Sequence, residues 1–429
     1  MRPPTAVTSP ATLYTFRPTW SYPAGVNMAE LQPIEAALAA LLEDVAPLAA
    51  EVVNCSHAAG RVLSDAVLAR LDVPPFDNSA MDGYALHHDD AGQPLPITQR
   101  VAAGTAVQPL TPASCARIFT GGELPPGADC VVMQERVEKK DGLAVIPADI
   151  SAGDNIRRRG RDVQAGAPLL DAGVRLDAAA LGHLAGQGIT EVVVRRRPRV
   201  ALLSTGDEIV DPGQPLAPGQ IYNSNRPMLR QLLERFGAEV VLVASVPDDP
   251  EGTRATLSRA AQEADVVVST GGVSVGEEDH VRAALEAIGR LDLWRLAIRP
   301  GKPLALGRLP GEGGRPVRFI GLPGNPVSCF VGAWLFLRPL MGALLGCPAL
   351  AALPVLSARA DFATSTGPRR HYMRVALTFG EQGIMARAFR DQNSGVLSSC
   401  VSADALAVIP EQSCIEPGDS VACLWLRVD

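Results

Sequence analysis

The sequence lacks the features of nucleic-acid-binding, membrane-spanning and metal-thiolate proteins. Its 429 residues carry a formal net charge of −7, so an anionic ligand would have to be met by local positive charge. The eight cysteines form no CxxC pair, which favours buried, reduced thiols over a zinc site. The longest apolar run, Cys329 to Leu337, is too short to span a bilayer. We therefore predict a cytoplasmic protein that binds neither nucleic acid nor membranes.

The first 27 residues lack the apolar core of a signal peptide and contain five prolines. We predict a flexible N-terminal extension over 1–27, and Met28 is a candidate start of translation. The whole chain is too long for one ordinary core, so its length predicts roughly two to four domains.

The pattern of apolar residues changes along the chain. Short apolar runs broken by glycine and proline favour a β-rich domain over 52–150, and similar texture from Leu353 onward favours a small β domain or barrel. Between them, 197–346 alternates buried β runs with amphipathic helices. That rhythm is typical of a mostly parallel sheet with right-handed crossovers. The fold class is thus α/β multidomain.

The standard nucleotide motifs are also missing, since no glycine loop ends in Gly-Lys-Ser/Thr and no strand is followed by GxGxxG. Instead, "LLSTGDE", "VVVSTGG" and "FIGLPGNPVS" place glycine turns after three apolar runs. Strand ends of a parallel sheet share one edge, where ligands collect. Gly271 and Gly272 would let backbone N–H groups approach an anion there, and Ser274 follows them. A tight turn without a ligand is the alternative for each turn taken singly.

Charges of both signs accompany these turns. Glu208 and Asp279 would repel a bound phosphate unless a divalent cation lay between, and Mg²⁺ commonly uses one or two carboxylates with phosphate oxygens. Helix capping is the alternative, and it is preferred for Glu277 and Glu278, whereas Asp279 is left open. Asp248 adds a further acid. The basic residues are Arg295, Arg299 and Lys302 of "WRLAIRPGKP".

Two polar stretches lie in the β-rich part. "PPFDNSAMDGYAL" holds Asp77, Asn78, Ser79 and Asp82, and an Asx-rich turn is its alternative interpretation. "NIRRRGRD" ends in Asp162, and a solvated surface is the alternative for its arginines.

Eight blocks in order carry a family resemblance: "VPPFDNSAMDGYAL", "RIFTGGELPPGADCVVMQE", "GDNIRRRGRDV", "VALLSTGDEIV", "IYNSN", "STGGVSVGEEDH", "RPGKPLALG" and "GLPGNPVS". Over about Met28 to Asp429 the chain resembles the molybdopterin molybdenumtransferase family (MoeA), which is similar to the gephyrin E domain. The resemblance implies an elongated homodimer of four-domain chains with a composite active site. It implies insertion of molybdenum from molybdate into adenylylated molybdopterin, with Mg²⁺, releasing AMP and molybdenum cofactor.

With this family architecture the chain divides into five kinds of segment: an extension over 1–27, helical or linking segments over 28–65 and 163–196, a β-rich domain over 66–162, a molybdopterin-binding α/β domain over 197–350 and a C-terminal β-barrel over 351–429. The resemblance also allows contacts with a molybdopterin-adenylating enzyme and with molybdoenzyme apoproteins.

The resemblance carries over to single positions. Catalytic roles fall on Asp77, Thr120, Asp162 and Glu208, and metal binding falls on Glu208 and Asp279. Substrate binding is implied at matched basic, acidic and turn positions: Asp248, Arg295, Arg299, Lys302, Arg374 and Ser394. Arginine stands at 295 and 299 where family members have lysine, which keeps the charge and changes its geometry.

Two other functions remain open at this point. The α/β part alone also resembles molybdopterin adenylyltransferases, which would consume ATP with free molybdopterin. A non-catalytic molybdopterin-binding scaffold would bind the pterin without releasing AMP.

Overall fold

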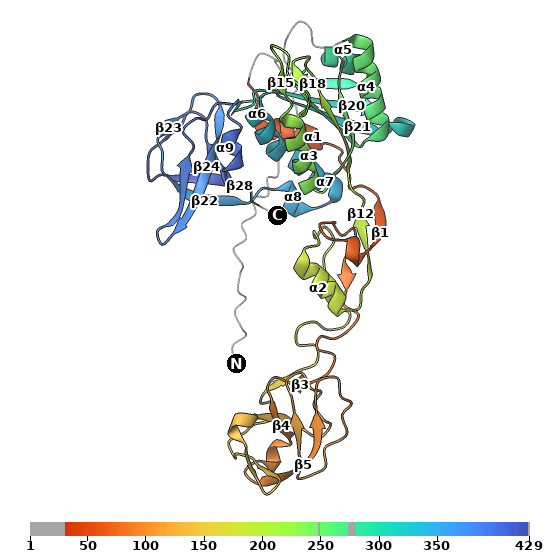
Figure 1. Cartoon of the computed structure of the whole chain (residues 1–429), viewed down its shortest axis with the longest axis vertical. Coiled ribbons are helices and arrows are strands. Elements are labelled where there is room, and N and C mark those ends of the chain that lie inside the picture. The colour runs from red at the N-terminus through yellow and green to blue at the C-terminus, as the bar shows by residue number, and fades with distance from the viewer. Residues whose placement is uncertain (1–30, 248, 273–279, 428–429) are drawn as a thin grey trace.

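The computed structural model describes residues 31–247, 249–272 and 280–427. Within these ranges the chain forms four bodies in an elongated molecule (Figure 1). An α/β body and a β-barrel lie beside each other at one end, a β-rich body lies at the other, and a small linking body lies between. The predicted α/β multidomain fold is confirmed.

The α/β body is built on six strands: β13 (Arg199–Ser204), β16 (Glu239–Ser245), β17 (Val266–Thr270), β18 (Arg290–Arg295), β20 (Pro303–Pro310) and β21 (Pro316–Leu322). Their order is β16-β13-β17-β21-β20-β18. The first four pair in parallel, and β20 runs against both of its neighbours. The carboxyl ends of β13, β17 and β21 therefore meet at one edge.

Helices cover both faces of this sheet: α3 (Asn225–Arg235), α4 (Pro250–Glu263), α5 (His280–Ile288), α6 (Pro326–Gly332) and α7 (Arg338–Leu345). A short helix, α8 (Pro348–Ala351), packs against α7. Successive strand residues alternate between faces. Leu202 of β13 packs with Leu229 of α3 in one core, whereas Leu203 packs with Leu257 of α4 in another. The central strands β13 and β17 are therefore buried on both faces, which fits their nearly continuous apolar sequences.

The run Pro326–Leu345 contains α6, a π-helical segment (Ala333–Leu337) and α7. By length and composition its 20 residues could cross a membrane, but 89% of its most apolar 18-residue stretch is buried inside the protein. It is the central core helix of the α/β body, with Trp334 packed edge-on against Phe236.

Helix α1 (Ile34–Leu42) buries Ile34, Ala37 and Leu41 in this same core. It therefore packs in the α/β body, whereas the sequence interpretation had grouped it with the linking segment 28–65. Its apolar stripe predicts a helix but does not specify which body covers that stripe.

The linking body is made from two distant segments. Strand β1 (Ala50–Asn54) pairs antiparallel with β12 (Glu191–Arg195), and β2 (Val67–Leu68) pairs with β11 (Pro168–Leu170). Helix α2 (Ala178–Gly186), capped by the Asp177 side chain, covers their core. The β-rich body is inserted between these segments.

The β-rich body contains eight short strands: β3 (Asn78–Ser79), β4 (Gly83–Leu86), β5 (Pro94–Val101), β6 (Cys115–Ile118), β7 (Cys130–Met133), β8 (Glu138–Lys140), β9 (Leu143–Val145) and β10 (Ile156–Arg157). Six form a sheet of order β7-β4-β6-β5-β9-β8, and β3 pairs with β10. A 3₁₀ turn, η2 (His88–Asp90), follows β4.

The C-terminal body is a closed barrel of five strands: β22 (Val355–Ala360), β24 (Arg370–Gly380), β25 (Gly383–Ala388), β26 (Ala405–Ile409) and β28 (Ser420–Trp425). Each strand pairs with two others around the circuit β24-β25-β22-β28-β26-β24. Strand β19 (Ile298–Arg299) leaves the α/β body and adds to β24 in parallel. This pairing ties the barrel to the α/β body.

Candidate active site

The three predicted glycine turns meet at one edge of the α/β sheet. Ser204 at the end of β13 is in register with Thr270 of β17, which in turn is in register with Leu322 of β21. The N–H of Gly271 donates to the carbonyl of Leu322, and Asn225 Nδ2 donates to the carbonyl of Gly324 at 2.7 Å. The expectation that these turns share a rim is confirmed.

The backbone at Gly271 and Gly272 requires glycine. Both have positive φ, 81° and 62°. A Cβ on Gly271 would lie 2.6 Å from Thr205 Oγ1, and one on Gly272 would lie 3.0 Å from a methyl carbon of Val281. Any side chain would therefore clash with Thr205 or Val281, so only glycine lets this turn pack closely against the turn after β13.

A cavity of about 410 Å³ opens at this rim, within the size range of small-molecule sites. Its walls come from the turns after β17 and β21, from the turn that follows β19, and from the barrel. The lining residues are Gly271, Gly272, Arg299, Pro300, Gly301, Lys302, Pro303, Pro323, Gly324, Asn325, Ser328, Arg369, Gln392, Asn393 and Ser394. The cavity thus lies at the seam between the α/β body and the barrel.

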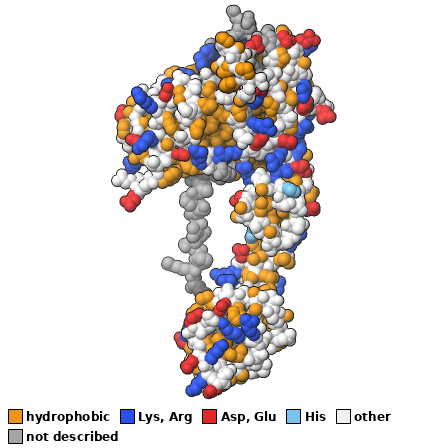
Figure 2. All heavy atoms as spheres, in the orientation of Figure 1, with side chains coloured by type: hydrophobic (Ala, Val, Ile, Leu, Met, Phe, Trp, Pro, Cys, Tyr) orange, Lys and Arg blue, Asp and Glu red, His pale blue; other side chains and the backbone are white. Residues whose placement is uncertain are grey.

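The charge of this cavity is positive. Arg299, Lys302 and Arg369 line it, and none of them forms an ion pair with a carboxylate within the described ranges. Burial lowers the pKa of the adjacent His371 to about 4, and the positive charges of Arg299, Arg374 and Arg369 act in the same direction. Although the net charge of the chain is negative, Lys and Arg side chains also gather along the lower edge of the α/β body and barrel in the view of Figure 2. The cavity is suited to an anionic ligand.

Five of the predicted binding residues line this cavity: Gly271, Gly272, Arg299, Lys302 and Ser394. The backbone N–H of Val327 in α6 donates to the Ser394 carbonyl at 3.0 Å, which fixes the barrel loop against the α/β body. Arg369, Gln392 and Asn393 also line the cavity and were missed. Their sequence block was too loosely defined to indicate them.

Arg374 does not reach the cavity. Its guanidinium is fully buried in β24 and donates to Ser399 Oγ at 3.0 Å and to the carbonyls of Gln392 at 3.1 Å and Asn393 at 3.1 Å. It also donates to the Asp391 carbonyl at 3.3 Å. The structure therefore places this predicted substrate-binding residue beneath the 391–394 loop, where it holds the lining residues in position.

The acidic side of the rim is only partly described. Glu208 is exposed in the turn after β13, and its carboxylate lies against Gly206, where an added Cβ would be 2.4 Å from Oε2. Arg295 is exposed at the end of β18 and is absent from the cavity lining. Asp248, Ser274 and Asp279 lie outside the described residues, so their predicted roles stay predictions.

A second cluster of predicted residues lies in the β-rich body. The pairing of β3 with β10 brings Asp77 beside the arginine run. Arg158 Nη1 donates to Asp77 Oδ2 at 2.6 Å, and the N–H of Arg159 donates to Oδ1 at 2.8 Å. Burial raises the pKa of Asp77, but these hydrogen bonds outweigh it and leave the pKa below its usual value. Asp77 is thus a carboxylate at neutral pH.

Thr120 is held by an aspartate that the site prediction did not include. Asp82 Oδ1 accepts hydrogen bonds from the Thr120 N–H at 2.8 Å and hydroxyl at 2.7 Å, and these bonds lower the Asp82 pKa. Asp82 lies in the same polar stretch of sequence as Asp77, and that position is the sequence feature that could have identified it. Asp162 is exposed, and its N–H donates to the Val73 carbonyl at 2.9 Å where the β-rich body joins the linking body.

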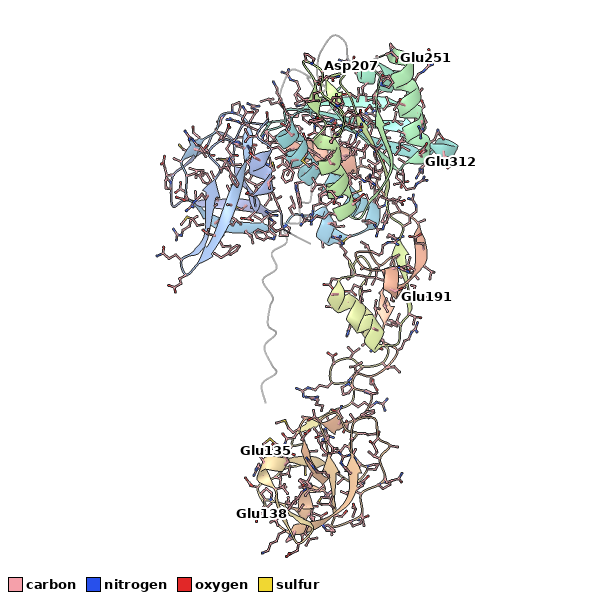
Figure 3. The ribbon with its side chains drawn as sticks, viewed as in Figure 1. Glu135, Glu138, Glu191, Asp207, Glu251 and Glu312 are labelled. Carbon is pink, nitrogen blue, oxygen red and sulfur yellow. The ribbon has the colours of Figure 1, made fainter. Side chains whose placement is uncertain are left out.

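The cavity in the α/β body and the residue cluster in the β-rich body lie at opposite ends of the elongated molecule. Asp207, next to Glu208, lies in the α/β body, whereas Glu135 and Glu138 lie in the β-rich body beyond the linking body (Figure 3). The structure therefore brings the predicted residues together as two separate groups.

Comparisons with known proteins cover most of the chain. Residues 32–188 match the family model "MoeA N-terminal region (domain I and II)", 201–343 match "Probable molybdopterin binding domain" and 358–426 match "MoeA C-terminal region (domain IV)". The molybdopterin molybdenumtransferase of Haemophilus influenzae is 37% identical over 382 residues, covering 87% of this chain and 93% of the relative. That of Nostoc sp. is 37% identical over 391 residues, covering 88% and 89%. A molybdopterin biosynthesis MoeA protein from Pyrococcus horikoshii has a TM-score of 0.78 at 28% identity, covering 92% of this chain and 100% of that one.

Proposed function

The chain belongs to the MoeA family of molybdopterin molybdenumtransferases, and on that premise we propose that it transfers molybdenum from molybdate to adenylylated molybdopterin with Mg²⁺, releasing AMP. Molybdenum insertion in cofactor biosynthesis follows from the family. The adenylylated form of the substrate, the metal and the residue roles are the proposed part. A cytoplasmic location belongs to the same proposal.

The observation that carries the proposal is the cation-lined cavity beside the Gly271 turn. A diphosphate needs positive charge and closely approaching N–H groups, and the cavity offers Arg299, Lys302 and Arg369 together with that glycine turn. Because the three cations have no carboxylate partner among the described residues, their charge is available to the ligand. Arg295 would add a further cation at the rim.

The rim also fits a magnesium ion. Glu208 offers a hard oxygen donor at the same sheet edge, lying against a glycine whose Cβ would fill the carboxylate's place. Glu208 and Asp279 would hold the ion. When bound, it offsets the negative charge of the diphosphate as the adenylate leaves. Asp248 and Ser274 remain proposed substrate contacts at this edge.

Asp77, Thr120 and Asp162 would act on the molybdenum side. Hydrogen bonds from the Arg159 N–H and the Arg158 guanidinium keep the pKa of Asp77 below its usual value, so its carboxylate is suited to accept hydrogen bonds from protonated oxygen atoms of molybdate. Asp82 fixes the Thr120 hydroxyl, so Thr120 uses its oxygen lone pairs toward a ligand. These acceptors would orient molybdate oxygens that have taken up protons, and those oxygens would leave as water as the two dithiolene sulfurs bind molybdenum.

We propose that two copies of the chain complete each site. In one chain the linking body separates the β-rich body, where Asp77 directly precedes β3, from the α/β body, where Lys302 directly precedes β20 (Figure 1). The β-rich body of one copy would therefore serve the cavity of the other. In such a homodimer, each active site takes its two groups of residues from different chains.

Mixing two inactive variants tests this arrangement. Asp77→Asn and Lys302→Ala should each abolish most turnover as homodimers. A mixed dimer would contain one intact site and one doubly altered site, so random re-association should restore about one quarter of wild-type activity. If mixed dimers form and stay inactive, each site lies within one chain and the proposal is wrong.

Turnover tests the chemistry itself. With adenylylated molybdopterin and Mg²⁺, AMP release should require molybdate, and a parallel reaction with tungstate measures the preference between the two oxyanions. ATP consumption with free molybdopterin would favour an adenylyltransferase instead. Tight pterin binding without AMP release would favour a scaffold.

A further inference from the structure

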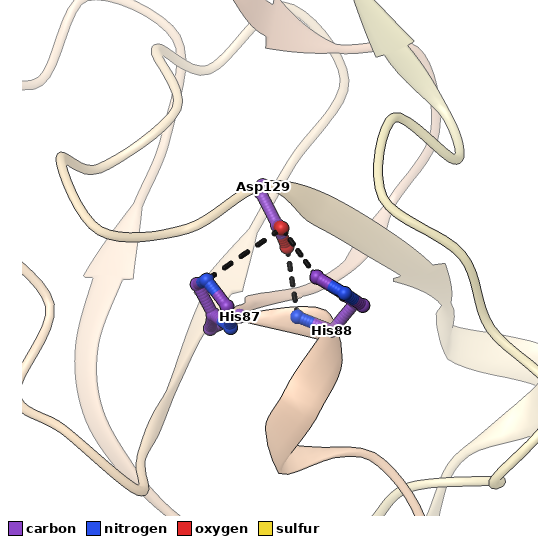
Figure 4. A group of neighbouring side chains, drawn as sticks. All are labelled: His87, His88 and Asp129. Carbon is purple, nitrogen blue, oxygen red and sulfur yellow. Dashed lines mark hydrogen bonds and ion pairs between the residues drawn. The ribbon is translucent and has the colours of Figure 1, made fainter.

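Two adjacent histidines and an aspartate form a cluster in the β-rich body, apart from the proposed active site. His87 and His88 follow strand β4, and Asp129 directly precedes β7. The two strands are antiparallel neighbours, with Leu86 in register with Cys130, so the residues at this end of the pair meet (Figure 4). One ligand atom from each of the three lies within 4.8 Å of the others.

Asp129 is fixed toward both imidazoles. Its Oδ1 accepts a hydrogen bond from the His88 N–H at 2.8 Å, which sets the orientation of the carboxylate. Its Oδ2 lies 2.5 Å from His88 Nδ1 and 3.7 Å from His87 Nε2. The two rings stack with centroids 4.9 Å apart and an interplanar angle of 30°, so both present a nitrogen to the same carboxylate oxygen.

A second carboxylate lies on the other side of the rings. Asp89 Oδ1 is 3.3 Å from His88 Nε2, and Asp89 Oδ2 is 3.5 Å from His87 Nδ1. Each imidazole therefore has one nitrogen facing Asp129 and the other facing Asp89. In metal sites, a carboxylate on the outer nitrogen fixes the ring and makes the inner nitrogen a better ligand.

We propose that His87, His88 and Asp129 bind a divalent transition-metal ion, with Zn²⁺ as the reference ion. Two imidazoles and one carboxylate suit zinc, copper or nickel, whereas Mg²⁺ prefers a shell of oxygen atoms. The side chains of the three are 43%, 38% and 28% exposed, so a metal and its remaining water ligands can enter from solvent. The proton between His88 Nδ1 and Asp129 leaves to solvent when the metal binds.

The position of this cluster indicates a structural role. Gly83 and Met133 lie at the opposite end of the β4–β7 pair from Leu86 and Cys130. Asp82, which holds Thr120, directly precedes Gly83. A metal at the histidine end would fasten β4 to β7 without contacting the candidate catalytic residues. It should therefore stabilise the β-rich body and leave turnover unchanged.

Zinc titration of the metal-free full chain tests this proposal by calorimetry. His87→Gln is the informative variant, because the polar contacts of His87 with Asp89 and Asp129 are long, at 3.4 to 3.7 Å, and its ring stacks on a partly exposed histidine, so its loss should not unfold the chain. We expect wild type to bind one more zinc ion per chain than His87→Gln, or to bind it at least about tenfold more tightly. His57→Gln, which removes an exposed histidine of the linking body, is the matched control and should bind like wild type.

Thermal unfolding provides an independent readout. Because a ligand that binds only the folded state raises the melting temperature, Zn²⁺ should raise the melting temperature of wild type and of His57→Gln, and raise that of His87→Gln less. Asp129→Asn should behave like His87→Gln. Equal zinc stoichiometry and affinity in wild type and His87→Gln would overturn the proposal, as would the absence of zinc binding to wild type at micromolar concentration.

Discussion

Arg374→Ala tests whether the active-site cavity depends on a loop that is held from beneath. The Arg374 guanidinium is fully buried and donates four hydrogen bonds, to Ser399 Oγ and to the carbonyls of residues 391, 392 and 393. Its backbone completes the network, since the Arg374 N–H donates to Gln392 Oε1 at 3.0 Å and the Gln392 amide donates to the Arg374 carbonyl at 2.9 Å. Removing the side chain leaves three carbonyls without this donor.

The expected loss of stability follows from these contacts. Each buried acceptor left without a partner costs about 1–3 kcal/mol. Two effects reduce the sum: water can reach the partly exposed loop, and the variant no longer buries a guanidinium whose pKa is lowered by burial. A net decrease of about 3 kcal/mol in the free energy of unfolding is therefore expected.

Urea-induced unfolding measures this change, together with AMP release. Arg387→Ala is the matched control, because Arg387 is an exposed barrel arginine whose ion pair with Asp361 at 3.1 Å should contribute at most about 1 kcal/mol. Arg374→Lys keeps the charge but loses the forked donor geometry, so its stability should lie between those of wild type and Arg374→Ala.

The two readouts separate positioning from direct substrate contact. If Arg374→Ala is as stable as Arg387→Ala and yet loses turnover, the guanidinium contacts substrate and the reasoning from the loop is refuted. If stability and substrate affinity fall together while proteolysis within 391–394 becomes faster, the positioning role is supported.

Two further variants examine the turn and the pH dependence. Gly271 has a φ of 81°, and a Cβ there would lie 2.6 Å from Thr205 Oγ1. Gly271→Ala should therefore cost about 1–3 kcal/mol of stability and raise the KM for the pterin substrate. Gly219→Ala is the control, because Gly219 has a φ of 87° with open space around it, and its KM should be unchanged. Equal KM values would show that the turn does not approach the ligand. Burial raises the pKa of Asp265, but a paired hydrogen bond with Arg196 at 2.6 and 2.8 Å outweighs it and lowers the pKa. The stabilisation is present above the unfolded-state pKa of about 3.9 and is lost as pH falls through the lower folded value. Asp265→Asn should therefore lose about 2–4 kcal/mol at pH 7 in urea unfolding, and a difference from wild type that did not shrink below pH 4 would contradict this.

The α/β sheet and its ligand edge could be predicted because their signals are local. Continuous apolar runs indicate strands buried on both faces, and parallel strands place Ser204, Thr270 and Leu322 at one edge wherever the helices lie. The partner of α1 could not be predicted, because a helix stripe shows only that one face is buried. Closure of the barrel likewise depends on pairing between distant strands, such as β24 with β26.

The residues of the candidate site that lie in turns at strand ends could be predicted from the sequence. The lining residues that come from the barrel were harder to predict. Arg369 reaches the cavity only because β19 pairs with β24 across two bodies, and no local pattern encodes that pairing. Arg374 carried a signal that was misread. A single arginine inside the apolar run "HYMRVAL" is typical of a buried network that satisfies backbone carbonyls.

The two-segment construction of the linking body sets an order of folding during synthesis. Arg61, whose guanidinium donates to the Arg195 carbonyl at 2.9 Å, leaves the ribosome 134 residues before its partner. The inserted β-rich body has all of its strands between β2 and β11 and is complete before then. It can therefore fold first and shorten the effective loop that β1 and β12 must close. A destabilised β-rich body should then delay assembly of the linking body.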